Sequence, residues 1–469
     1  MSKLRPYQVQ ATAHLSHGWK LHKRQVLAMT TGSGKTYTFA YMAKLAAERN
    51  KTVLILTHRT ELFSQTFDTF QDVGLDPYII NADGGDPPSY TGVFVVMVET
   101  LARRQELMDR LHPDLIIIDE AHFGNFTKII DAYPDAYVLG VTATPIGKHF
   151  FEYYTNIVQP IDTPDLIAQG FLVPYKAYQM KDDFSDLKKG ASGDYSEKSQ
   201  FGHFDKDKLY DGVIEEWNKR CQGEKTVVFN CNIKHSNEMA AKFNAAGIKS
   251  YSLTSQTSAK DRKRMLDEFH NGDCMVLNNN GILTTGYDHP PIKCIILNRA
   301  SDSLTLFLQM VGRGSRTFPG KTGFVCLDFG GNHSRHGLWS HPRKWELKDK
   351  RRTKEGEAAV KDCPVCEAMI YAGARICEYC GHEFPIVIKG LKDGVMEEYY
   401  EKDIPDKPLN ECSPEEFALL VRLDRLARGK AIGMMRRRGR TTLSEFARHM
   451  NYSQGWVHRQ MSFVKKKEV

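Results

Sequence analysis

The sequence of 469 residues contains no long run of apolar residues. An apolar stretch such as Leu115–Ile118 has the length of a buried strand, whereas a membrane-spanning helix needs about 20 residues. The first residues, Met1–Arg5, lead into no apolar signal segment. We therefore expect no membrane partner and a cytoplasm-like compartment.

Cysteine is also scarce, because ten in 469 residues are too few for a disulfide scaffold. Four of them form a CxxC-x10-CxxC array, the spacing of a tetrahedral zinc site. Two disulfides are disfavoured by the compartment, and a redox pair leaves the second CxxC unexplained. We predict a Zn²⁺ ribbon over residues 358–388 with the ligands Cys363, Cys366, Cys377 and Cys380.

The ribbon's role stays open between gripping DNA, wedging a fork and bracing a neighbouring domain. Four side chains in it have the chemistry to stack on bases, although aromatic residues of so small a module also form its core. These four are Tyr371, Arg375, Tyr379 and Phe384.

Most of the chain carries no excess of positive charge. The net charge is +7, but Ser413–Val469 alone holds 13 Lys/Arg against 5 Asp/Glu, which leaves about −1 for the rest. Ser413 and Pro414 have the pattern of a helix start, and apolar residues then recur at helical spacing. We predict a basic helical domain over 413–469 that binds a polyanion, with a merely solvated helix face as the alternative.

Short apolar runs alternate with amphipathic helical stretches over most of the chain, which predicts parallel sheets covered by helices. The pattern stops near residue 156 and restarts, so we predict an α/β fold with two domains, 1–156 and 157–345. Residues 182–207 are polar and weakly periodic, which indicates a linker or an insertion.

The segment Met29–Thr36 has the composition of a phosphate-binding loop between a strand and a helix. Its glycines let backbone N–H groups turn toward phosphates at the positive end of the helix dipole. Lys35 is expected to meet the β- and γ-phosphates of ATP, and Thr36 to hold Mg²⁺. The expected contacts of the loop are Thr31, Gly32, Ser33, Gly34, Lys35 and Thr36.

A second acidic element complements this loop. The apolar strand over 114–119 ends in Asp119 and Glu120, so both carboxylates emerge at the carboxyl edge of the sheet. We expect Asp119 to hold Mg²⁺ and Glu120 to orient the attacking water. Alone, such a pair is often only a turn or a helix cap.

Two arginines in the second domain, Arg313 and Arg316, follow a helical pattern three residues apart. Arginines placed across an interdomain cleft can stabilise charge on a transferring phosphoryl group. Together with Lys35, Asp119 and Glu120 they form the predicted catalytic set.

In this order the motifs resemble the superfamily 2 helicases, in the branch of type III restriction motors and RecG-, XPB- and UvsW-like remodellers. The resemblance covers about residues 4–328 and implies two tandem RecA-like domains. Asp119-Glu120-Ala121-His122 and Thr142 differ from the DEAD-box RNA-clamping group and favour a DNA-directed member, phage-encoded or bacterial.

The resemblance also assigns binding roles. Leu4–Gln8 is similar to the adenine-reading segment, with Gln8 on the base edge and Arg5 nearby, and motif V brings Gly286 and Asp288 to the nucleotide. Motif III, Thr142–Pro145, is expected to couple hydrolysis to the nucleic-acid track. The expected phosphate-backbone contacts are Arg59, Thr100, Thr284 and Thr285.

These features predict an ATP-dependent DNA helicase of recombination, repair or replication, acting on forks, junctions or single strands with weak sequence preference. Its cofactors would be ATP, Mg²⁺ and Zn²⁺, and replication or recombination proteins are possible partners. Three alternatives stay open: a duplex translocase without strand separation, an RNA helicase, and a degenerate binding module without turnover. The intact catalytic set argues against the last.

Overall fold

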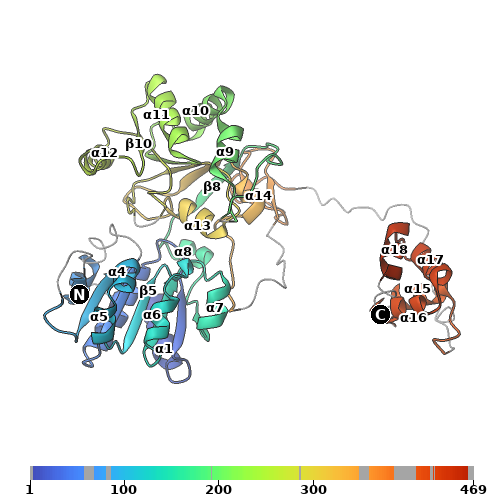
Figure 1. Ribbon diagram of the computed structural model, residues 1–469. Helices are drawn as coiled ribbons and strands as arrows, with labels where there is room; N and C mark the ends of the chain where they lie inside the picture. Colours follow the sequence, from blue (N-terminus) through green and yellow to red (C-terminus); the bar gives the residue numbers. More distant parts are fainter. Residues whose placement is uncertain are drawn as a thin grey trace. The chain divides into compact units, whose positions relative to one another are not determined.

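The computed structural model describes residues 4–57, 68–80, 86–191, 193–284, 287–347, 359–384, 408–422, 426 and 428–462. They form two compact units, Met1–Pro385 and Ile386–Val469, which are described separately (Figure 1). None of the described helices has the length and apolar character needed to span a bilayer.

The first lobe of unit 1 contains a parallel sheet of seven strands in the order β3-β4-β2-β5-β6-β1-β7. The strands are β1 Arg24–Ala28, β2 Val53–Thr57, β3 Tyr78–Ile80, β4 Val93–Met97, β5 Leu115–Asp119, β6 Tyr137–Thr142 and β7 Asn156–Val158. Successive residues of the central strands enter separate cores on the two faces, as Ile117 and Ile116 do. Continuous apolar strands are therefore required here.

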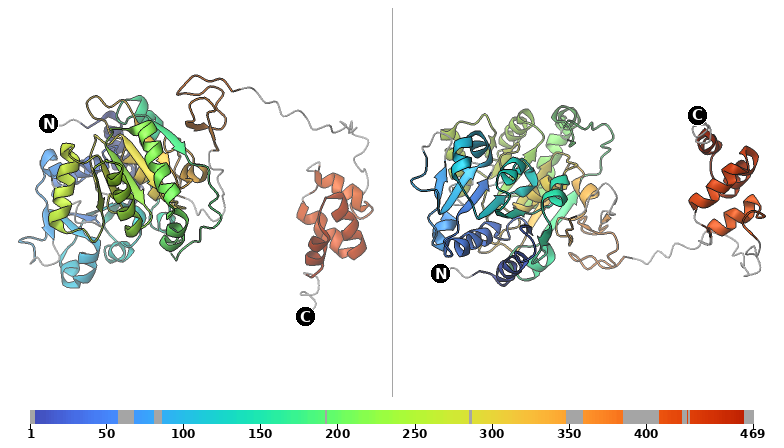
Figure 2. Two further views of the ribbon diagram at one scale, coloured as in Figure 1. Left: turned by 90° about the horizontal axis from the view of Figure 1, so that it is seen from above. Right: turned by 60° about the horizontal axis from the view of Figure 1, so that its bottom comes forward.

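Helices cover both faces of this sheet (Figure 2). They are α1 Pro6–Gly18, α2 Lys35–Ala47, α4 Val98–Arg103, α5 Gln105–Arg110, α6 Thr127–Ala132, α7 Lys148–Tyr153 and α8 Thr163–Ala168, with a short 3-10 turn η1 at Ala121–Phe123.

The second lobe contains a parallel sheet of six strands in the order β10-β11-β9-β12-β13-β8. The strands are β8 Tyr175–Gln179, β9 Thr226–Asn230, β10 Ser250–Leu253, β11 Val276–Asn279, β12 Cys294–Asn298 and β13 Phe324–Asp328. The helices are α9 Glu197–Phe204, α10 Asp207–Cys221, α11 Ile233–Ala245, α12 Ala259–Asn271, α13 Leu304–Gly312 and α14 Asn332–His336. The two tandem RecA-like parallel sheets predicted from sequence are confirmed.

The polar segment 182–207 is a folded insertion of the second lobe. Asp194 accepts hydrogen bonds from the Ser301 hydroxyl (2.8 Å) and the Asp302 N–H (2.6 Å). Gln200 Oε1 accepts from the Ala300 N–H at 3.0 Å. The side chains of Asp194 and Gln200 thus accept hydrogen bonds from the turn after β12 and attach the segment to the second lobe. Of the two interpretations, the insertion applies to this segment and the linker does not.

A strap formed by residues 337–347 runs from the second lobe back to the first. Arg343 is held inside its turn by hydrogen bonds to four backbone carbonyls, those of His336, Leu338, Trp339 and His341. The first lobe receives the strap through Gln159, whose amide accepts from Trp345 N (3.1 Å) and donates to Arg343 O (2.7 Å). Leu347 then packs on a first-lobe core.

The zinc-ribbon segment contributes an antiparallel pair, β14 Val360–Asp362 and β15 Met369–Tyr371. Unit 2 is helical, with α15 Pro414–Arg422, α16 Arg428–Arg437, α17 Arg440–His449 and α18 Gln454–Ser462 around one apolar core (Figure 1).

The hydrogen bonds of Arg343 within the strap lead to a prediction about the stability of unit 1. Arg343→Ala leaves four carbonyls of a half-buried turn without their donor, so we expect it to lower the free energy of unfolding of unit 1 by about 2–3 kcal/mol. Thermal unfolding of this variant is compared with that of Lys344→Ala, which removes the exposed neighbouring charge. Equal unfolding temperatures for the two variants would contradict a structural role of Arg343.

Candidate nucleotide site and metal centre

The phosphate-binding loop lies between β1 and α2, as its sequence predicts. Gly32 (φ 84°) and Gly34 (φ 81°) adopt left-handed backbone conformations, which glycine enters without strain. A Cβ on Gly34 would lie 2.8 Å from Gln8 Nε2. Helix α2 begins at Lys35, so its free N–H groups face the loop.

The N-terminal segment holds this loop in shape. The Tyr7 hydroxyl donates to Ser33 O at 2.6 Å, and Gln8 Nε2 donates to Gly34 O at 3.1 Å. Gln8 Oε1 accepts from Arg5 N at 2.8 Å. The adenine role of Gln8 stays a prediction, and Tyr7 is a loop contact that the sequence did not single out.

Phe171, in the segment that leads from the first lobe into the second, packs on this N-terminal segment. The guanidinium of Arg5 lies 4.7 Å from the ring centroid of Phe171, and the rings of Tyr7 and Phe171 meet edge to face at 5.3 Å. Cation–π contact favours such a stack. Phe171 thus places a flat apolar surface beside the segment expected to meet adenine.

The acidic pair lies where strand β5 ends. Asp119 is buried, and burial together with the charge of Glu120 raises the pKa of its carboxyl to about 7, although Lys35 opposes the shift. Burial also opposes ionisation of Glu120, but the hydrogen bond from His122 and the charges of Lys35 and Arg313 outweigh it, so its pKa falls to about 2. The pKa values of the two neighbouring carboxyls are thus pushed in opposite directions, upward for Asp119 and downward for Glu120.

His122 joins the acidic pair to motif III. Its Nδ1 lies 3.3 Å from Glu120 Oε2 and 3.2 Å from the Thr142 hydroxyl. Thr142 Oγ1 in turn accepts from Thr144 N at 3.0 Å. A change at Glu120 therefore reaches the Thr142–Pro145 segment through a single side chain.

Arg313 and Arg316 do not share a helical face, because α13 ends at Gly312. Arg313 donates from its guanidinium to Thr284 O (2.6 and 3.1 Å) and Tyr287 O (2.5 Å). Arg316 lies beyond the helix, in a β-bridge with Leu172, and its Nε is 2.7 Å from Asp288 Oδ1. Motif V therefore holds both arginines.

A buried lysine that the sequence did not single out also joins motif V, residues 283–290, to the arginine segment 309–316, called motif VI below. Lys321 donates to Pro290 O (2.8 Å) and Gly314 O (2.7 Å). Burial, with the nearby charges of Arg316 and Lys293, lowers its pKa to about 7. No local motif marks this lysine, because its two acceptors come from separate parts of the chain.

Motif VI lies against the phosphate loop. A Cβ on Gly312 would be 3.0 Å from Thr31 Cβ, and one on Gly32 would be 3.4 Å from Ser315 Oγ and 3.6 Å from Arg316 Cγ. Burial lowers the pKa of Lys35, the acids Glu120 and Asp119 counteract it, and Arg313 and Arg316 lower it further. The structure thus brings together all five predicted catalytic side chains.

The arrangement fits a magnesium nucleotide. Arg316 Nη1 is buried with no hydrogen-bond partner in the described part of the chain, as expected of a donor meant for a phosphate oxygen. Thr36 and Asp119 are the residues that would hold Mg²⁺, which would neutralise phosphate charge there.

The predicted nucleic-acid contacts are less defined. Thr100 is half-buried on α4, and the hydroxyl of buried Thr284 donates to Gly281 O at 2.6 Å. Arg59, Thr285 and the nucleotide contact Gly286 lie outside the described residues. These roles stay predictions.

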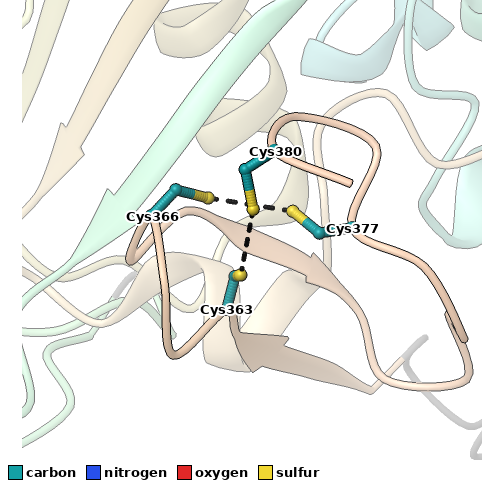
Figure 3. Close-up of side chains that lie close together, drawn as sticks. All are labelled: Cys363, Cys366, Cys377 and Cys380. Atoms are coloured by element: carbon teal, nitrogen blue, oxygen red, sulfur yellow. Dashed lines mark hydrogen bonds between the residues drawn. The ribbon is translucent and has the colours of Figure 1, made fainter. Parts of the chain in front are cut away.

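The four cysteine sulfurs converge, all within 4.8 Å of one another (Figure 3). The Sγ atoms of Cys363 and Cys380 are 3.6 Å apart, and those of Cys366 and Cys377 are 3.7 Å apart. Sulfurs about 2.3 Å from a tetrahedral ion lie about 3.8 Å apart, so the four cysteines have the spacing of a zinc site.

Two equivalent turns present these sulfurs. Glu367 N donates to Cys363 O (2.8 Å), and Gly381 N donates to Cys377 O (2.9 Å). Glu367 and Gly381 both have positive φ, of 61° and 73°. The left-handed conformation costs more free energy for Glu367 than for a glycine, because its Cβ crowds the following carbonyl oxygen.

The ribbon packs on the second lobe, along its edge strand β8. The Tyr379 hydroxyl donates to Tyr175 O at 3.0 Å, and Asp362 lies 2.7 Å from Lys181 Nζ. Glu367 pairs with Lys219 (3.1 Å) and Arg220 on α10. Tyr379 and Phe384 belong to the ribbon's own packing, whereas Tyr371 is half exposed. These contacts favour the bracing role for the module.

Fold and site together define a two-lobed, P-loop nucleoside triphosphatase. The family model "Type III restriction enzyme, res subunit" matches residues 1–147, and the model "Helicase conserved C-terminal domain" matches residues 207–317. The chain is 31% identical over 374 residues to a "51.5 kDa protein" of a Lactococcus phage, covering 77% of this chain and 78% of that protein. The chain belongs to the superfamily 2 helicases and is an ATP-hydrolysing enzyme.

Two solved structures share the fold. A fragment of a putative HsdR subunit of a type I restriction enzyme from Vibrio vulnificus has a TM-score of 0.59 at 24% identity, covering 72% of this chain and 67% of that chain. The ATP-dependent Type ISP restriction-modification enzyme LlaBIII bound to DNA has a TM-score of 0.51 at 18% identity, covering 69% of this chain and 27% of that chain. The chain spans about half the length of several further curated relatives.

The contact between motifs V and VI yields a kinetic prediction. Asp288→Ala removes the carboxylate that orients Arg316, so we expect ATP turnover to fall about 10- to 100-fold while nucleotide affinity changes less. Steady-state ATPase assays and nucleotide titrations measure the two effects. Asp273→Ala, at an exposed acid, is the matched control; equal turnover in both variants would remove Asp288 from the catalytic machinery.

The sulfur cluster predicts a bound metal. Freshly purified protein should contain about one zinc per chain by elemental analysis, because four thiolates form a closed site. Cys380→Ser should lose most of it, while Val365→Ala, at an exposed position of the same turn, should keep it. Zinc-free wild-type protein, or full retention in the serine variant, would contradict the assignment.

Proposed function

We propose that this enzyme is an ATP-dependent DNA helicase that unwinds or branch-migrates forks and junctions in recombination, repair or replication. The observation that carries the proposal is the attachment of both motif VI arginines to motif V. Motif V is expected to grip the nucleic-acid backbone, and its carbonyls at Thr284 and Tyr287 and its carboxylate at Asp288 position Arg313 and Arg316.

This connection makes hydrolysis and grip parts of one mechanical unit. Arg313 and Arg316 are drawn toward the γ-phosphate when ATP is present and lose that attraction when it leaves. Because they are bonded to motif V, the second lobe's hold on the strand changes with them. His122 makes the matching connection in the first lobe, between Glu120 and Thr142. Alternation of two grips moves the motor along a strand.

We expect DNA to be the preferred track because LlaBIII, an ATP-dependent restriction-modification enzyme of similar fold, is described as bound to DNA. The second candidate is a motor that translocates on duplex without separating the strands. Backbone contacts do not by themselves distinguish the sugars, so RNA belongs among the tested substrates.

The test combines ATPase and strand-separation assays on single-stranded DNA, RNA, forked duplexes and four-way junctions. We expect DNA to stimulate hydrolysis more than RNA does, and forks or junctions to be separated with ATP. Lys35→Ala should lower ATPase by more than about 100-fold and abolish separation while DNA binding stays measurable. Lys20→Ala, at an exposed lysine of the same lobe, should behave as the wild type.

The alternatives give different results. Displacement of streptavidin from blunt duplex without strand separation would identify the duplex translocase. Stimulation and unwinding with RNA alone would identify an RNA helicase. Full hydrolysis by Lys35→Ala would contradict the site itself.

A further inference from the structure

Helices α17 and α18 of unit 2 are joined by a tight turn with backbone hydrogen bonds. Helix α17 ends at His449, and Asn451 adopts the left-handed conformation with φ 60°. Tyr452 N donates to Ala447 O (2.7 Å) and Asn451 N donates to Arg448 O (3.2 Å). These two hydrogen bonds are those of the Schellman motif, which ends a helix and turns the chain away from its axis. Asparagine takes the place that glycine usually has there.

The next helix begins at once. The hydroxyl of Ser453 accepts from Trp456 N at 3.3 Å, as the cap of α18. The connection from Met450 to Ser453 is thus four residues long, and the rings of Tyr452 and Trp456 pack at 4.5 Å. A turn of three to four residues between two helices has the length found in the helix-turn-helix unit.

The packing behind the turn fits this unit. Leu443, Phe446 and Ala447 of α17 are buried, at 0–1% exposure, together with Val457 of α18. The small side chain of Ala447 lets the two helices approach closely. Phe417 and Leu420 of α15 belong to the same core, so a third helix supports the pair from behind.

The outer face of α18 is left open. Its first turn exposes Gln454 and Gly455, and His458 follows one turn later on the same side. Gln454 carries an amide that can bond to adenine in two places, and Gly455 adds no side chain that would hold the helix away from a partner. Polar side chains at the N-terminal end of a helix are suited to base edges.

The arginines of this unit divide into two kinds. Arg438 is structural, because its guanidinium donates to the carbonyls of Leu409, Asn410 and Cys412 and lies over the Phe417 ring. Arg437, Arg440 and Arg448 are exposed, and Arg440 starts α17. The positive charge that the sequence predicts to bind a polyanion is therefore only partly available for that role.

We propose that α17 and α18 form a helix-turn-helix reader of duplex DNA, which places α18 in the major groove while the exposed arginines contact the phosphates. The partner is duplex DNA with a preferred short sequence, because exposed polar groups for bases and exposed arginines occur together in one unit. This site lies outside the ATP-driven motor, whose own backbone contacts carry no sequence information. A sequence preference would direct the enzyme to particular loci.

The test is a selection of random-sequence duplexes by the full-length wild-type protein in the absence of ATP, followed by anisotropy titrations. We expect a short enriched sequence. The double variant Gln454→Ala/His458→Ala should weaken binding to the selected duplex about tenfold or more and leave binding to a scrambled duplex within about twofold. Glu415→Gln, at an exposed residue of α15, is the control and should bind both duplexes as the wild type does.

A second variant separates the two kinds of contact. Arg440→Ala/Arg448→Ala should weaken binding to both duplexes equally and flatten the salt dependence. DNA-stimulated ATPase, measured alongside, reports the motor independently, so loss of either activity is distinguishable. Absence of any enriched sequence, equal effects of the Gln454/His458 pair on both duplexes, or selective binding of RNA or of a protein through α18 would overturn the proposal.

Discussion

The nucleotide site depends on three cations that the two lobes bring close together in a buried place. The charges of Arg313 and Arg316 repel that of Lys35, while Asp119, Glu120 and, beside Arg316, Asp288 offset the repulsion. Burial makes this repulsion stronger than it would be in water. A bound polyphosphate would add negative charge among the three cations. We therefore expect the charge of the nucleotide to favour contact between the lobes.

The rest of unit 1 keeps the first-lobe and second-lobe residues of the nucleotide site close together. Glycines at 32 and 312 allow the phosphate loop and motif VI to touch, and the strap from residue 337 to 347 joins the lobes again behind them. Asp288 and Lys321 connect the arginine segment to motif V, which we expect to contact the nucleic-acid strand. The site is a property of the interface and belongs to neither sheet alone.

Much of this was predictable from the sequence. Strand-ending acids, the glycine loop and the cysteine spacing are local patterns whose chemistry requires a particular fold around them, and the two parallel sheets follow from continuous apolar strands. The short strands β3 and β7, of three residues each, and the polar edge strand β8 lack that signal. Arg316 was misplaced because helical spacing was extended past Gly312, where α13 ends. Tyr7, Phe171 and Lys321 act through partners far along the chain, which no local pattern shows.

The ribbon's position on β8 has a consequence for how molecules of this enzyme behave toward each other. An uncovered edge strand offers its carbonyl and N–H groups to any other chain. Tyr379 occupies the carbonyl of Tyr175 on that edge, and the ribbon's bulk lies alongside. Zinc bound by the four cysteines would hold the ribbon in this place, so loss of the metal would expose the edge of the second sheet to strands of other chains.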